Sequence, residues 1–307
     1  LTGGSSGREG AALQTGGSLG ASLGRLLHLG NKNTNLIILC GMSATFTALF
    51  GTPLAATVFS IEVVSIGILH YSALLPCLLS SLVAFGVTYF LQVAPTAYIL
   101  LGAPTLHALP LLRTGLLAIL CALLSIVFCE AMHRFSHLYK RLFPRAWVRV
   151  LVGSGLVIAV SLLSGTRDYN GAGSEVILRA LQGQALPWAF ALKLLLTALT
   201  LGCGFRGGEI VPTFFIGATF GCWMGGLLGL EPAFGAAIGL VALFCAVVNC
   251  PLASILLSVE LFGSSHLLFF ALACALSYLL SGHFSLYSSQ KIIYSKLEPT
   301  FINADAH

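Results

Sequence analysis

Two glutamates, Glu9 and Glu209, each open an apolar segment long enough to form a helix. Glu9 lies in residues 7–24 (GREGAALQTGGSLGASLG), and Glu209 lies in residues 207–221 (GGEIVPTFFIGATFG). A helix start presents free N–H groups and the positive end of the helix dipole, which together bind anions. A carboxylate at the bilayer centre costs about 2.5–3.5 kcal/mol, so it usually faces a cavity. The pattern predicts an anion site at which the Glu9 carboxylate competes with the anion for the same backbone amides. The alternative is that Glu9 lies in a solvated first turn, where it only interacts favourably with the helix dipole.

The composition is that of a membrane protein. Hydrophobic residues make up 57% of the 307 residues and charged residues 8%, whereas soluble domains carry roughly 25% charged residues. The sequence therefore predicts a multi-pass protein embedded in the lipid bilayer. The net charge of +5 is small and scattered, which argues against nucleic-acid binding. The nine cysteines form no CxxC pair, and no cofactor or metal motif is expected.

Several of the predicted helices are too short to cross a bilayer, which takes about 20 residues. Breaks at glycine, proline or asparagine separate them, so half-spanning and broken helices are expected. A basic run from Arg134 to Arg149 predicts a cytoplasmic loop, and Lys291 and Lys296 place the C-terminus on the same side. The predicted helices are residues 11–29, 35–50, 53–70, 73–92, 110–134, 146–164, 187–202, 212–229, 233–248, 251–262, 266–281 and 286–297.

An internal repeat divides the chain. Residues 51–63 (GTPLAATVFSIEV) align without a gap on residues 249–261 (NCPLASILLSVEL), which pairs Pro53 with Pro251 and Glu62 with Glu260. We expect residues 1–108 to be the remainder of a first repeat and residues 109–307 to be a second, with no C-terminal soluble domain. Repeats of this kind are often inverted across the membrane and place substrate between broken helices.

Five motifs in order carry a family resemblance: GREG at residues 7–10, GTPLA…FSIE, GGEIVP, NCPLA…SVEL and LYSSQ at residues 286–290. At these positions the chain resembles the CLC family of chloride channels and anion/proton exchangers. The resemblance implies an all-α membrane fold of two inverted repeats and a homodimer with one pore per subunit. Its interface would come from residues 53–92 and 251–281. The family's serine-bearing anion loop would lie before Leu1, so we expect the first repeat to be incomplete.

The resemblance also assigns roles. Glu9 would be the gating glutamate, which occupies an anion site when ionised and leaves it when protonated, and the Tyr287 hydroxyl would hold the central ion. Desolvation raises the pKa of a carboxyl group while N–H donors lower it, so such a glutamate can couple anion movement to proton uptake. The anion path would be lined by backbone amides of Arg8, Gly10, Ala11, Ile210 and Val211.

Departures from the family pattern bear on the transported ion. Val63 stands where chloride/proton exchangers carry an internal proton glutamate, and Glu209 adds a carboxylate beside the central site. The GGE pattern, with MSATFTALFGTPLA at residues 42–55, is similar to the fluoride/proton exchangers, although Val211 replaces their usual threonine; Ala11 replaces a common proline. We predict proton-coupled antiport of chloride or fluoride in a bacterial inner or plasma membrane. The alternative is a passive chloride channel, gated or ungated by voltage.

Competing motifs are weaker. Residues 4–7 fit the GxSG of intramembrane serine proteases, which need a histidine base such as His266 or His283. Residues 202–207 fit GxGxxG, but no strand precedes them. Glu130, His133 and His137 have metal-like spacing beside the basic loop, where a solvated helix end is favoured. Glu62 and Glu260 end their helices, so we expect them to reach water or a basic partner. No enzymatic activity is expected.

Overall fold

The structure, a computed structural model, describes residues 3–93, 96, 98, 100, 102, 104–287, 289–298 and 300–305. Within these residues the chain is mostly helical, with one small sheet. The first helices are α1 (Glu9–Leu26), α2 (Asn31–Phe50), α3 (Pro53–Glu62) and α4 (Leu74–Phe90). The middle of the chain forms α5 (Ala108–Leu142), α6 (Ala146–Leu163), α7 (Ser174–Leu181) and α8 (Ala189–Gly202). The last helices are α9 (Ile210–Leu227), α10 (Pro232–Val248), α11 (Pro251–Phe262) and α12 (Leu267–Leu280).

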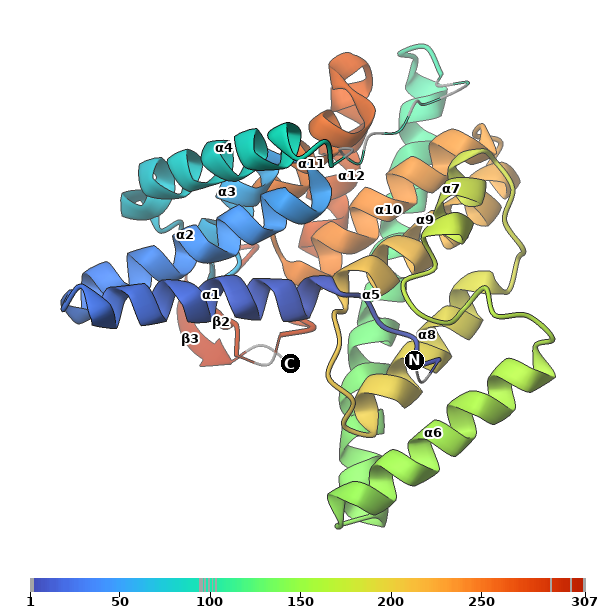
Figure 1. Ribbon diagram of the computed structural model, residues 1–307. Coiled ribbons are helices and arrows are strands. Elements are labelled where there is room, and N and C mark those ends of the chain that lie inside the picture. The colour runs from blue at the N-terminus through green and yellow to red at the C-terminus, as the bar shows by residue number, and fades with distance from the viewer. Residues whose placement is uncertain are drawn as a thin grey trace.

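Helices α1–α4 and α5–α9 form two groups, and the contact between α3 and α11 connects the first group to the C-terminal helices. Figure 1 shows α1–α4, in blue and teal, on one side and α5–α9, in green and yellow, on the other. The α10 helix packs against α5, α9, α11 and α12, and every one of its residues from Ala233 to Val248 is buried. A helix that is apolar all round belongs in the centre of a fold, because it has no polar face to present to water. The buried core therefore surrounds α10.

Among the residues that the structure describes, five helices are long and apolar enough to cross a membrane: Asn31–Phe50, Tyr71–Phe90, Ala108–Leu142, Ala146–Leu163 and Ile210–Leu227. By contrast, α3 and α11 have 10 and 12 residues. At 1.5 Å per residue they cover about half of a ~30 Å hydrocarbon layer. The expected mixture of spanning and half-spanning helices is confirmed.

The two repeated segments lie side by side and antiparallel. The Glu62 carboxylate at the end of α3 accepts hydrogen bonds from the backbone amides of Leu252 (3.2 Å) and Ala253 (2.8 Å), at the start of α11. Glu260, at the end of α11, accepts from Leu54 (2.9 Å) and Ala55 (2.8 Å), at the start of α3. Each carboxylate thus caps the opposite helix, where the positive dipole end favours it. Both glutamates therefore have a structural role as caps, and neither has a basic partner among the described residues.

Glycines let helix pairs approach closely. A Cβ added at Gly41 of α2 would overlap the carbonyl of Gly16 in α1, and a Cβ at Gly16 would overlap the carbonyl of Gly41. The α9–α10 pair is packed in the same way through Gly217 and Gly239. Close backbone approach through small residues is typical of membrane helix pairs.

One expected helix and two expected helix ends were wrong. The described residues of 286–297 form no helix; they contain an irregular turn and β2 (Lys291–Tyr294), which pairs parallel with β1 (Ser65–Ile66) and antiparallel with β3 (Phe301–Asp305). The β-branched and aromatic residues of β2 favour this pairing. The α3 helix ends at Glu62 and not at residue 70, because the chain after it forms β1, which pairs with β2. The α5 helix continues to Leu142, eight residues beyond its predicted end at 134.

Candidate functional site

The two glutamate-bearing helix starts meet in the structure. Gly7 and Gly208 form an isolated antiparallel bridge, in which each amide donates to the other's carbonyl, at 2.8 Å and 2.9 Å. A Cβ on Gly10 would lie 2.9 Å from the Gly208 Cα, so glycine is required for this approach. The first turns of α1 and α9 are thereby held against each other, although about 200 residues separate them in the chain.

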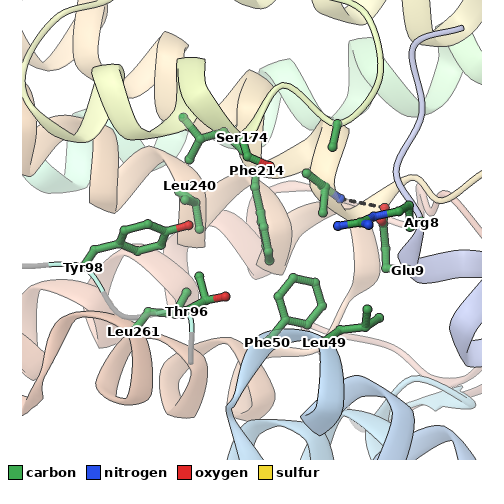
Figure 2. Close-up of a pocket in the computed structure, with 13 residues that line it drawn as sticks. Arg8, Glu9, Leu49, Phe50, Thr96, Tyr98, Ser174, Phe214, Leu240 and Leu261 are labelled. Atoms are coloured by element: carbon green, nitrogen blue, oxygen red, sulfur yellow. Dashed lines mark hydrogen bonds between the residues drawn. The ribbon is translucent and has the colours of Figure 1, made fainter. Parts of the chain in front are cut away.

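The Glu9 side chain lies in the gap between these helix starts. It is 2% exposed, and its Oε1 accepts a hydrogen bond of 2.8 Å from the backbone amide of Val211, in the first turn of α9. The dashed line in Figure 2 marks this bond. A Cβ on Gly7 or Gly208 would overlap the carboxylate. An acid that occupies a free amide at a helix start takes the place that an anion would otherwise fill.

A cavity of about 170 Å³ lies beside Glu9. Arg8, which is exposed, and Glu9 lie at one end of it, and Tyr98 lies at the other (Figure 2). Phe50 and Phe214 line its wall, with ring centroids 5.7 Å apart. These two rings belong to a closed circuit of contacts between α2, α3, α9 and α10, made by Phe46, Phe50, Phe59, Phe214 and Phe244. The cavity therefore has a polar end at the helix starts and an aromatic wall.

The other predicted residues are placed differently. Glu209 precedes α9, its carboxylate makes no hydrogen bond to a described residue, and it does not line this cavity. Tyr287 is half-buried and packs against the core. The side chain of Ile210 is buried in the core, so only its backbone faces the site. Ala11 is exposed on α1.

Comparison with known proteins identifies the family. The sequence profile described as voltage gated chloride channel matches residues 1–282. The chain belongs to the voltage-gated chloride channel (CLC) family. A chloride/fluoride channel protein of Pseudomonas syringae is 36% identical over 303 residues, which cover 96% of this chain and 67% of the relative. The H(+)/Cl(-) exchange transporter ClcA of Vibrio cholerae is 26% identical over 279 residues, 85% of this chain and 59% of the relative.

Solved structures agree with this CLC assignment. The crystal structure of a CLC-type fluoride/proton antiporter matches with a TM-score of 0.91 and 32% identity, over 94% of this chain and 73% of that one. The expected all-α CLC architecture and multi-pass membrane location are therefore confirmed. The relatives are named as channels, exchangers and antiporters, that is, as proteins that move ions.

Sequence reasoning missed a polar face on α8 of this CLC chain. Lys193 is fully buried, and its Nζ donates to the carbonyls of Tyr169 (3.1 Å) and Gly171 (2.7 Å). One turn further on, Thr197 Oγ1 lies 3.1 Å from Ser5 Oγ, and Thr200 Oγ1 accepts from the Ser5 amide at 3.1 Å. The hydrogen bonds from this face to Ser5 fix the position of the segment that precedes Glu9. The i, i+4, i+7 spacing of Lys193, Thr197 and Thr200 in an apolar helix was a signal that could have revealed it.

The residues of the competing motifs make structural contacts in the CLC fold. The serine of the GxSG motif, Ser6, makes no hydrogen bond to a histidine among the described residues. The neighbouring Ser5 is bonded to α8, and the His266 ring packs edge-on against Phe234 at 5.9 Å. Glu130 pairs with Arg134, and His133 Nε2 lies 3.0 Å from the Ser285 carbonyl. The metal-like spacing on α5 therefore serves separate contacts.

Proposed function

We propose that this chain moves a small inorganic anion, chloride or fluoride, across a membrane in exchange for protons, and that Glu9 is the gate. The observation that carries the proposal is the 2.8 Å hydrogen bond from the Val211 amide to the Glu9 carboxylate. The ionised acid occupies a helix-start amide that a transported anion needs. Once protonated, it loses its charge attraction to the helix dipole and can leave. Anion entry and proton uptake then become one event.

The remaining site residues follow from this role. Arg8 and Val211 line the cavity beside Glu9. The backbone amides of Arg8, Gly10, Ala11, Ile210 and Val211 line the anion path, as the family resemblance implies. The Tyr287 hydroxyl holds the central ion. Glu209 is a second group that takes up protons or repels anions, just before the start of α9. Support comes from relatives named as a chloride/fluoride channel protein and a fluoride/proton antiporter. The family resemblance of the motifs that contain these positions also supports it, although Ala11 and Val211 themselves depart from the family pattern.

A passive chloride channel is the second candidate. Val63 stands at the position where chloride/proton exchangers have an internal proton glutamate, and its carbonyl is bonded to the Gln290 side chain (2.9 Å). A side chain without a titratable group cannot relay a proton from this point. Proton coupling then requires another route, for which Glu209 is the candidate.

The test is anion efflux from liposomes that contain the full-length protein, with fluoride or chloride inside and proton movement recorded at the same time. We expect protons to move opposite to the anion. Glu9→Gln keeps the shape of the side chain but cannot exchange a proton, so we expect anion flux without proton flux. Glu298→Gln, at an exposed position, is the matched control. Proton movement that survives Glu9→Gln would refute the gate, and chloride flux without protons in the unmodified protein would establish a channel.

We further propose that the protein is a homodimer in a bacterial inner or plasma membrane, with one pore per subunit. The α4 helix supports this, because it exposes Leu75, Leu79, Leu82 and Val83 along its length. An apolar face of this kind marks an interaction surface or a lipid-facing one. Chemical crosslinking in liposomes separates the two.

A further inference from the structure

A chain of polar side chains, buried except for the half-buried Lys296, lies against the backbone of Tyr287. It consists of Ser285, Gln290, Asn249 and Lys296, and we call it the Tyr287 support network. The Ser285 hydroxyl accepts from the Tyr287 amide (3.1 Å) and donates to Gln290 Oε1 (2.7 Å). The backbone N–H of Gln290 in turn donates to the Tyr287 carbonyl at 3.0 Å. Both backbone groups of Tyr287 are thus bonded within the network.

Gln290 connects this turn to two helix ends. It is 2% exposed, and its Nε2 donates to the carbonyls of Val63 (2.9 Å) and Val248 (3.0 Å), which follow α3 and end α10. Its Oε1 also lies 3.4 Å from the Asn249 side-chain amide. Both of its N–H groups and its oxygen are therefore engaged, so the side chain has a single orientation.

Lys296 completes the network. Its Nζ donates to Asn249 Oδ1, to the Tyr278 carbonyl (3.0 Å) and to Ser281 Oγ (2.9 Å), which uses all three N–H groups. It also lies 4.4 Å from the centroid of the Tyr278 ring. No carboxylate among the described residues pairs with it, and the negative end of α10 favours its charge. His133 Nε2, at 3.0 Å from the Ser285 carbonyl, is the other titratable group in contact with the network.

Asn249 is held in a strained backbone conformation to make these contacts. Its φ is +58°, in the left-handed region, and its side chain links Gln290, Lys296 and the Phe284 carbonyl (2.9 Å). At the aligned position of the first repeat, Gly51 has a φ of +70°. Glycine adopts this conformation without strain. The asparagine at this helix end is needed for its side-chain amide, since the backbone alone would favour glycine.

We propose that the Tyr287 support network positions the Tyr287 hydroxyl in the ion path, and so sets how tightly the central site holds its anion and how strictly anion and proton movements are coupled. This inference rests on the proposed role of Tyr287 as the ligand of the central ion. The four network residues are positioning residues, since they reach the ion only through Tyr287. A loosened Tyr287 holds the anion less tightly and lets it pass without its proton.

The test is Asn249→Gly, which keeps the left-handed backbone and removes only the side-chain amide. In liposomes with the full-length protein we expect the half-saturating fluoride concentration to rise about fivefold, the scale of one lost hydrogen bond. We also expect the number of protons moved per fluoride to fall, with the maximal rate maintained. Gln290→Leu should act in the same direction. Ser43→Ala, at a buried serine bonded to Ser81 in the α2–α4 contact, is the matched control.

A double-mutant cycle decides whether the network acts through Tyr287. If it does, Asn249→Gly adds little to the effect of Tyr287→Phe, because the hydroxyl that it positions is already gone. If the double variant shows the product of the two separate effects, the inference is overturned and the role of Tyr287 stands. The same holds if Asn249→Gly lowers the maximal rate but leaves the half-saturating fluoride concentration and the number of protons per fluoride unchanged. No effect of Tyr287→Phe alone would overturn that role and the inference with it. If Asn249→Gly fails to fold, Lys296→Met carries the same cycle.

Discussion

Replacing Glu260 by glutamine tests the reciprocal caps between α3 and α11. The Glu260 carboxylate accepts two backbone hydrogen bonds, from Leu54 and Ala55, at the start of α3. A glutamine keeps one oxygen for one of these amides but turns its own NH₂ group toward the other. One charge-assisted hydrogen bond is then lost, which costs about 1.5–3 kcal/mol. The attraction between the negative charge and the helix dipole, worth about 1 kcal/mol, is lost as well.

We therefore expect Glu260→Gln to lower the free energy of unfolding by about 2.5–4 kcal/mol. Glu62→Gln should have a similar effect, because Glu62 makes the same pair of bonds to Leu252 and Ala253. The two changes should cost less together than the sum of their separate effects, since breaking one cap already loosens the same helix pair.

The assay is reversible unfolding in mixed detergent micelles, followed by circular dichroism. Glu298→Gln is the control, because Glu298 is exposed and its replacement removes an equal charge. If Glu260→Gln is no less stable than Glu298→Gln, within about 0.5 kcal/mol, the usual range for surface substitutions, the capping argument is refuted.

Two further changes test the packing around the site. Lys193→Met leaves the carbonyls of Tyr169 and Gly171 unpaired, so we expect faster hydrogen exchange at the Gly171 amide, which donates to the Gly4 carbonyl, than in the exposed control Lys32→Met. Unchanged exchange would show that α8 does not hold this segment. Gly41→Ala should destabilise the α1–α2 pair by about 1–3 kcal/mol through overlap with Gly16. Gly86→Ala, whose added methyl meets open space, should be neutral or stabilising, and equal effects of the two would contradict the packing argument.

The local sequence determined the membrane environment, the positions of most helices and the residues that open α1 and α9. Composition alone requires a lipid-facing fold, and the glycines around Glu9 and Glu209 mark breaks at which free amides must occur. The ordered motifs also indicated the family, which the comparisons confirmed. The division into repeats at residue 108 and the roles of the site residues stay predictions.

Only the tertiary structure decided what these residues contact. The amide that Glu9 occupies belongs to Val211, the carboxylate of Glu62 caps α11, and Lys193 bonds a loop that precedes it by more than 20 residues. Hydrogen bonds between segments far apart in the chain leave no local pattern. A helix such as α10, apolar on every side, likewise has no periodicity to show which neighbours it meets.

The helix that was wrongly predicted at residues 286–297 also reflects contacts between segments far apart in the chain. The β2 strand forms because β1 and β3 are brought beside it, and a run of four residues cannot show whether partners of that kind exist. Residue types thus determined which polar and charged groups are present, whereas the packing of distant segments decided which groups contact one another. The reason is that Glu9, Glu62 and Lys193 each bond to a backbone group that its own local segment leaves unpaired.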